Sequence, residues 1–317
     1  MKTLIKNGLL IDPANQVQAY LNLILEDGKV VAVTEEEPEA DRVIDATGKV
    51  VAPGFIDIHM HEDPVKDGKI EFCIFDAMLR MGVTTAVGGN CGINVYDPVK
   101  YLDMVEKDGA PVNVMLFAGH QYFREAAGAL DKYAPVTKEQ QEHMKKGLEK
   151  ALEAGCVGIS YGLRYVPGTG RDEFLDTASC CEKEHRMISA HVRDDEDRVF
   201  GAVAEVAEAG KLYNIPVQVS HIGSMAGFGQ MKQLLRQVDG YSMNGIDVAC
   251  DCYPYFAFST RIGATTYDDG WLERYHCDYS ACQLTEGKYK GQRCTPETFA
   301  EMRRDFPECL TVCYVMD

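Results

Sequence analysis

Hydrophobic and polar residues alternate in short runs over the first fifty residues of the chain. Short runs at residues 3–6 and 9–11 are separated by Asn7-Gly8, and runs at residues 21–25 and 30–33 are separated by Asp27-Gly28. Asn-Gly and Asp-Gly favour tight turns between antiparallel strands. The pattern therefore predicts a small antiparallel sheet over residues 1–50.

From residue 50 onward, short apolar runs rich in β-branched residues alternate with longer helical stretches. Thr137 with Gln140 forms a capping-box pattern ahead of a helix over 144–152, and Asp97-Pro98 and Thr295-Pro296 start two further helices. Strands flanked by helices on both faces favour a parallel sheet that closes into a TIM-like (β/α)8 barrel. The seven predicted strands are 51–58, 83–87, 112–117, 157–161, 187–191, 217–221 and 246–251.

The rest of the chain completes the predicted domain organisation. Residues 1–50 form part of a small β domain, and residues 51–252 form barrel strands one to seven with their helices. The stretch from residue 253 to about 293 has no clear periodicity, which favours an insertion or lid. We therefore interpret residues 253–317 as that insertion followed by the lead-in to an eighth strand that the sequence does not contain, so the chain is expected to be truncated.

Composition and charge exclude several classes of partner. Hydrophobic residues make up 46% of the chain and charged residues 26%, which is ordinary for a folded globular protein. The formal net charge of −17 argues against nucleic acids and anionic membranes as partners. The sequence has neither a membrane-length apolar stretch nor a signal-peptide pattern at its amino end, so we expect a cytoplasmic protein whose twelve cysteines are mostly reduced thiols. A homo-oligomer is left open.

Metal-binding side chains stand at the ends of several predicted strands. His59 and His61 are two residues apart and therefore face the same side of the first strand. His191 and His221 end the fifth and sixth strands, and Cys91 closes the second. Catalytic groups of such barrels lie at the carboxyl ends of the strands, and imidazole with thiolate suits zinc. The sequence therefore predicts a zinc site built from these five residues.

The chain resembles the amidohydrolase superfamily, and within it the N-acyl-D-amino-acid deacylases, or D-aminoacylases. Barrels of this superfamily are preceded by a small β-sandwich, which residues 1–50 would form in part. The matching motifs lie at residues 51–61 (Val-Ala-Pro-Gly-Phe-Ile-Asp-Ile-His-Met-His), 88–92, 158–163, 190–193, 219–221 and 251–255.

The resemblance implies a role for each candidate metal ligand. His191, His221 and Cys91 would hold one tight zinc ion, and His59 and His61 would form a second, weaker position. Cys91 would take the place of the carboxylated lysine that hydantoinases carry on the fourth strand, where this chain reads Gly-Ile-Ser-Tyr at 158–161. Zinc lowers the pKa of bound water to about 7 and so supplies a nucleophile for an amide carbonyl.

Further polar residues are candidates for substrate contact and for support of the ligands. Tyr253 would polarise the scissile carbonyl, as the resemblance implies. Arg193 suits a substrate carboxylate, or pairs with one of the acidic residues 194–196. Ser259 and Arg261 are further candidates for carboxylate contact, or ordinary lid residues. Asp57 either orients a liganding histidine or holds the strand end.

The predicted reaction is zinc-dependent hydrolysis of the acyl amide of a small-molecule N-acyl amino acid, of D configuration. The family's general base is an aspartate on the eighth strand, so the chain as it stands is expected to be weakly active or inactive, and Asp317 is not assigned as that base. Two alternatives remain: a cyclic-amide hydrolase of the hydantoinase or dihydropyrimidinase kind, and a catalytically silent metal-binding relative.

Overall fold

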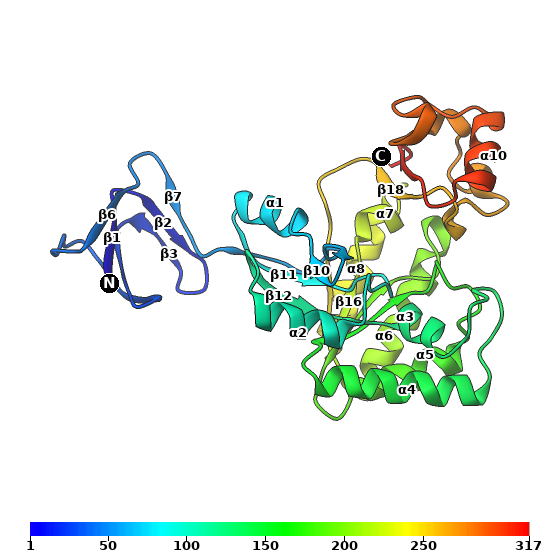
Figure 1. Ribbon diagram of the computed structural model, residues 1–317, viewed down its shortest axis with the longest axis horizontal. Coiled ribbons are helices and arrows are strands. Elements are labelled where there is room, and N and C mark those ends of the chain that lie inside the picture. The colour runs from blue at the N-terminus through cyan, green and yellow to red at the C-terminus, as the bar shows by residue number, and fades with distance from the viewer. Residues whose placement is uncertain (317) are drawn as a thin grey trace. The chain divides into compact units, whose positions relative to one another are not determined.

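The computed structural model describes residues 1–316 and divides into two compact units, Met1–Phe55 and the chain from Ile56 onward. The first unit contains two sheets (Figure 1). One has the order β5-β4-β1-β6, and the other has the order β3-β2-β7. Their strands are β1 (Lys2–Lys6), β2 (Leu9–Asp12), β3 (Val17–Tyr20), β4 (Asn22–Glu26), β5 (Lys29–Thr34), β6 (Arg42–Asp45) and β7 (Val50–Val51).

The prediction of a single antiparallel sheet is wrong for the first unit. β4 and β5, on either side of Asp27-Gly28, pair antiparallel as expected, but β1 and β2, on either side of Asn7-Gly8, lie in different sheets. Instead, β1 pairs with β6 and β2 pairs with β7 in parallel. Both exceptions join strands that are far apart in the sequence, whereas turn motifs predict only the pairing of consecutive strands. Leu4, Leu10 and Ile24 are the buried apolar residues of this unit's strands.

The second unit contains the seven predicted strands in one continuous order. One residue separates β12 (Asn113–Leu116) from β13 (Ala118–Gly119). β12 belongs to a sheet of order β12-β11-β8, and β13 belongs to a sheet of order β13-β14-β15-β16-β17, so these two segments connect the two sheets. The pairings from β13 to β17 and between β11 and β12 are parallel. The other strands are β8 (Phe55–Asp57), β11 (Val83–Gly88), β14 (Gly158–Gly162), β15 (Met187–His191), β16 (Val217–Val219) and β17 (Val248–Cys250).

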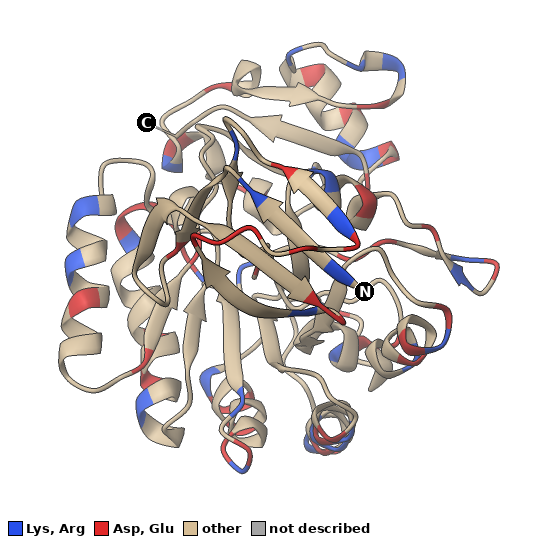
Figure 2. Ribbon diagram, turned by 90° about the vertical axis from the view of Figure 1, so that its left-hand side faces the viewer, with Lys and Arg blue, Asp and Glu red and all other residues tan. Residues whose placement is uncertain are grey.

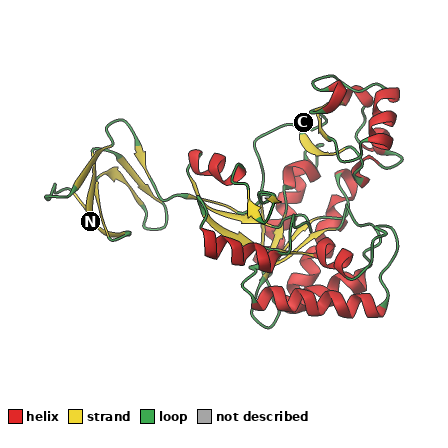
Figure 3. Cartoon of the chain, in the orientation of Figure 1, coloured by secondary structure: helices red, strands yellow, loops and turns green. Residues whose placement is uncertain are grey.

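Helices follow most of these strands (Figures 1 and 3). The predicted caps are present: Asp97 accepts hydrogen bonds from two amides at the start of α2, and Thr137 forms a capping box with Gln140. Both acidic and basic residues lie on the helices, whereas the strands of this unit are mostly uncharged (Figure 2). The helices are α1 (Ile74–Arg80), α2 (Pro98–Asp108), α3 (His120–Ala126), α4 (Lys138–Glu153), α5 (Arg171–Ala178), α6 (Val199–Tyr213), α7 (Ile222–Ala226) and α8 (Met231–Met243), and a small hairpin of β9 (Val65–Lys66) and β10 (Lys69–Ile70) precedes α1.

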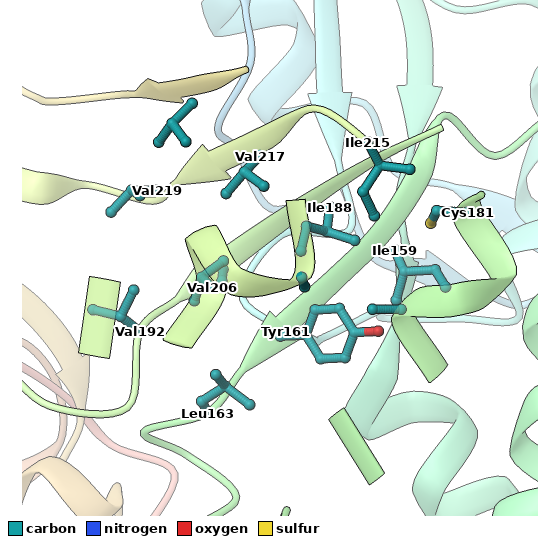
Figure 4. Close-up of a cluster of buried hydrophobic side chains, with 14 of the residues drawn as sticks. Ile159, Tyr161, Leu163, Cys181, Ile188, Val192, Val206, Ile215, Val217 and Val219 are labelled. Atoms are coloured by element: carbon teal, nitrogen blue, oxygen red, sulfur yellow. The ribbon is translucent and has the colours of Figure 1, made fainter. Parts of the chain in front are cut away.

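Along the central strands, alternate side chains point to opposite faces, one of which packs in the hydrophobic core. Ile159, Ile188 and Val217 are buried in the cluster that includes Val206 of α6 (Figure 4). The neighbouring positions Ser160 and Ser189 point to the opposite face, because successive side chains of a strand alternate. Both are buried and polar, so the opposite face of the strands is lined by hydrogen-bonding groups.

The stretch after β17, predicted as an insertion or lid, forms a structured region of its own. An antiparallel sheet of order β18-β20-β19 is accompanied by two helices and encloses its own hydrophobic cluster, which includes Tyr267, Trp271 and Phe299. Aromatic residues at irregular spacing build this cluster, so periodicity does not reveal it. The elements are β18 (Phe258–Arg261), α9 (Trp271–Arg274), β19 (Cys282–Leu284), α10 (Pro296–Asp305) and β20 (Leu310–Cys313). No helix among the described residues is long and apolar enough to cross a membrane.

Candidate metal centre

The structure brings all five predicted ligands together at the carboxyl ends of the strands. The ligand atoms form two groups, His59 with His61 and Cys91, and Cys91 with His191 and His221, and within each group they lie within 4.8 Å of one another. Cys91 belongs to both groups. Its Sγ lies 3.6 Å from Nε2 of His59 and 3.4 Å from Nε2 of His221. This arrangement matches a pair of adjacent metal positions that share one thiolate.

The loop that carries Cys91 depends on close backbone packing. Cys91 itself has a left-handed conformation with φ 56°, and Gly89 and Gly92 on either side also have positive φ. A Cβ atom on Gly162 would lie 2.2 Å from the Cys91 carbonyl oxygen. Glycine at position 162 therefore lets the loop after β11 approach β14 and places the thiol over the strand ends.

A buried amide joins the strands that bear the ligands. The side-chain nitrogen of Asn90 donates to the carbonyl oxygens of Val87 and Ile58, and its oxygen accepts from the Ser189 hydroxyl. Asn90 is completely buried. It therefore ties the chain after β8 to β11 and β15, which carry Cys91 and His191. Asn90 cannot be recognised from the sequence alone, because a neutral amide has no characteristic pattern.

The fourth strand of the barrel supports the Cys91 loop. β14 has the sequence Gly-Ile-Ser-Tyr-Gly and so contains no lysine. The buried hydroxyl of Ser160 accepts a hydrogen bond from the Gly92 amide at 3.0 Å and donates one to the Gly89 carbonyl oxygen. The strand thus positions the thiol and does not itself supply a bridging carboxylate.

Asp251, directly after β17, holds two of the predicted ligands. Its Oδ1 lies 3.2 Å from Nδ1 of His59 and accepts the backbone N–H of His221 at 2.7 Å, while its Oδ2 accepts from Gln218 at 2.8 Å. A carboxylate facing Nδ1 leaves Nε2 of His59 free for a metal. Asp57 was the sequence candidate for this role, but its carboxylate accepts the backbone N–H of His59 and so holds the strand end.

Burial and mutual charge shift the pKa values of the cluster in opposite directions. Burial opposes charge on His59, but the Cys91 thiolate and the Asp251 carboxylate outweigh it and raise the pKa of His59 to about 10. Burial also opposes the thiolate, yet His221 and His59 hold the pKa of Cys91 well below its usual value. Burial, reinforced by His221, lowers the pKa of His191 to about 4.

His191 provides the clearest sign of a missing ligand. Its side chain is only 4% exposed, and neither ring nitrogen has a hydrogen-bond partner. A buried polar atom without a partner is costly, so a group that binds it is expected. Since the surrounding donors are imidazoles and one thiolate, the residues fit zinc.

Two tyrosines lie beside the donor cluster. Tyr253, predicted from the sequence, is half-buried near the Ser224 hydroxyl, and its pKa is raised mainly by burial. Ser224 in turn contacts Nδ1 of His221 at 2.9 Å, which leaves Nε2 of that ring for a metal. Tyr165 was not predicted. Its ring centroid lies 4.4 Å from that of His191.

The three predicted contacts to a substrate carboxylate are engaged within the protein. Arg193 forms a bidentate pair with Glu205 of α6, at 3.0 and 2.8 Å, and not with the adjacent acidic residues. The Ser259 hydroxyl donates to a carbonyl of β20, and Arg261 pairs with Glu308 at 2.6 Å. Asp317 lies outside the described residues.

The chain is similar to several known proteins. The amidohydrolase family model matches residues 42–162. An N-acyl-D-glutamate deacylase of Alcaligenes xylosoxydans xylosoxydans is 31% identical over 283 residues, which are 81% of this chain and 57% of that protein. A dihydroorotase of Elusimicrobium minutum (strain Pei191) is 42% identical over 226 residues, 68% of this chain and 48% of that protein.

A crystal structure of an N-acyl-D-glutamate deacylase from Bordetella bronchiseptica, in complex with zinc and a phosphonate inhibitor, is 27% identical with a TM-score of 0.84, covering 99% of this chain and 72% of that one. The chain therefore belongs to the amidohydrolase superfamily. Within that superfamily it belongs to the D-aminoacylase family, and it spans a little over half the length of the curated deacylases that it matches.

Proposed function

We propose that this chain forms the metal centre of a zinc-dependent hydrolase that cleaves the acyl amide of an N-acyl-D-amino acid. The products are a carboxylate and a free amino acid. The observation that carries the proposal is the pair of donor groups that share Cys91, together with the unpartnered ring nitrogens of His191. The similarity to deacylases supports the choice of a linear N-acyl substrate.

In this proposal each donor group has its own task. Cys91, His191 and His221 hold the tighter zinc ion, because they are more buried than the other group. His59 and His61 complete the second, weaker position. When bound, zinc acts as a Lewis acid that polarises an amide carbonyl and lowers the pKa of water to about 7.

Tyr253 donates a hydrogen bond to the oxygen of the scissile carbonyl. Burial raises the pKa of Tyr253, so its hydroxyl keeps its proton at neutral pH and remains a donor. We assign no proton carrier among the described residues, because neither donor group includes a carboxylate and Asp251 is engaged by His59 and His221. The base would come from an eighth strand placed between β17 and β8, which are the two ends of the strand order.

Hydrolysis of a cyclic amide is the second candidate, because one of the relatives is a dihydroorotase. Against it stands β14, whose sequence Gly-Ile-Ser-Tyr-Gly lacks the lysine that a hydantoinase-type centre would need. The third candidate, a silent metal-binding relative, predicts metal without turnover in every form of the protein. We further propose a cytoplasmic location, which the twelve free cysteines support, and a small-molecule substrate; a homo-oligomer is compatible with all of these.

The test compares this chain with a form extended along its coding frame. Both would be loaded with zinc and assayed with N-acetyl-D-glutamate, N-acetyl-D-leucine, their L enantiomers, hydantoin and dihydroorotate. We expect release of free D-amino acid by the extended form. Turnover of the cyclic substrates alone would favour the second candidate, and a zinc-loaded extended form without turnover would favour the silent relative.

A further inference from the structure

Two buried thiols face each other in the sheet that follows the barrel strands. Cys282 lies in β19 and Cys313 in β20, and their Sγ atoms are 3.4 Å apart. Both residues are fully buried. Neither belongs to a group of three or more metal-binding side chains among the described residues. The pair is therefore a dithiol and separate from the metal centre.

The register of the two strands places this pair where a disulfide fits. Cys282 is directly opposite Cys313 in the antiparallel pairing. On either side of them, the backbone N–H of Tyr314 donates to the Ala281 carbonyl, and that of Thr285 donates to the Leu310 carbonyl. Backbone hydrogen bonds alternate along such a ladder, so the cysteines occupy a non-hydrogen-bonded position. There the Cα atoms are about 4.5 Å apart, inside the range of about 4.4 to 6.8 Å found for disulfides.

The two sulfur atoms also differ in acidity, which suits thiol-disulfide exchange. The contact between the two sulfur atoms lowers the pKa of Cys282, with a smaller contribution from the Tyr267 hydroxyl, and raises the pKa of Cys313. The thiolate is the attacking form in exchange. Cys282 is thus the first nucleophile and Cys313 the second. Cys282 also lies on the short outer strand of the sheet, which can open more readily than the central strand β20.

We propose that Cys282 and Cys313 form a reversible disulfide with small-molecule disulfides such as oxidised glutathione. The Cys282 thiolate attacks one sulfur of the reagent and releases one thiolate. Cys313 then loses its proton and attacks the Cys282 sulfur of the mixed disulfide, which releases the second thiol. The two protein thiols lose two electrons and two protons, and one reagent disulfide becomes two thiols.

The bridge would fix the last described strand of the chain. β20 pairs with β19 on one side and with β18 on the other, and Phe258 of β18 is the register partner of Cys313. Residues 282 and 313 close a loop of 31 residues that contains α10. A bridge across this loop restricts the unfolded chain, so oxidation stabilises the segment after β17.

The test uses the full chain with zinc bound, so that Cys91 is protected. The chain is equilibrated with oxidised and reduced glutathione in graded ratios, trapped with an alkylating reagent, digested and mapped by mass spectrometry. We expect a linked pair of peptides containing residues 282 and 313 at oxidising ratios, its loss with excess dithiothreitol, and a thermal midpoint for the oxidised form higher by about 5 °C or more.

Variants of these cysteines separate a specific bridge from general oxidation. Cys282→Ala and Cys313→Ala should each abolish the linked peptide and the oxidation-dependent shift, while Cys156→Ala, a buried cysteine near α4, should keep both. If either variant fails to fold, peptide mapping of the unaltered chain still decides the question. The proposal is overturned if no 282–313 link forms at any ratio, even in mild urea that opens the edge strand, or if other cysteines are linked in preference.

Discussion

Substitution of Asp251 by asparagine tests how the metal centre is held. Asparagine keeps the size of the side chain and still accepts the His221 N–H, but it removes the charge that faces Nδ1 of His59 at 3.2 Å. Carboxylates that orient a liganding histidine contribute 10- to 100-fold to metal affinity, or about 1.4 to 2.7 kcal/mol. We expect zinc binding at the His59–His61 position to weaken by about that factor.

The assay is competition with a chelator of known zinc affinity, with circular dichroism to confirm the fold. The matched control is Asp57→Asn, because Asp57 accepts only the backbone N–H of His59 and its loss should change zinc affinity less than about threefold. Equal affinity in Asp251→Asn and the unaltered chain, or a larger loss in the control, would refute the reasoning.

Two further predictions concern the packing at Gly162 and the release of protons on zinc binding. Gly162→Ala should destabilise the chain by about 1 to 3 kcal/mol, because the new methyl group would lie 2.2 Å from the Cys91 carbonyl oxygen. Gly240→Ala, in α8 with open space around it, should be neutral or stabilising by about 0.5 to 1 kcal/mol; denaturant titration compares the two, and equal effects would count against the packing argument. Zinc binding at pH 7 should release protons. The pKa of His59 is raised to about 10 in the metal-free chain, so the ring is protonated there and zinc must displace that proton; affinity therefore rises with pH below about 10. Binding enthalpies that are the same in buffers of different ionisation enthalpy would contradict this.

The barrel strands could be predicted from sequence because each is a short, largely apolar run that lies between longer helical stretches. All seven predicted strands are present, although β16 ends two residues before His221. The segment after β17 could not be predicted, since its core consists of aromatic residues such as Trp271 and Phe299 that come from short, irregular elements. No period in the sequence reports that kind of packing.

The candidate metal site, like the fold, could be predicted only in part from the sequence. The five donors could be recognised because histidine and cysteine at strand ends are unusual and have few other uses there. The residues that hold these donors in place, Asp251 and Asn90, could not be recognised, because their roles depend on which strands become neighbours. The pair of Arg193 with Glu205 could not be predicted either, because Glu205 lies on the following helix and reaches Arg193 across space and not along the strand.

The central claim is that two metal positions share the Cys91 thiolate. Anomalous scattering at the zinc edge from crystals of the zinc-loaded chain, compared with its Cys91→Ala variant, tests it most directly. We expect two peaks in the unaltered chain, the stronger one between Cys91, His191 and His221, and the loss of tight zinc in the variant. Peaks away from these side chains, or full retention of zinc by Cys91→Ala, would contradict it.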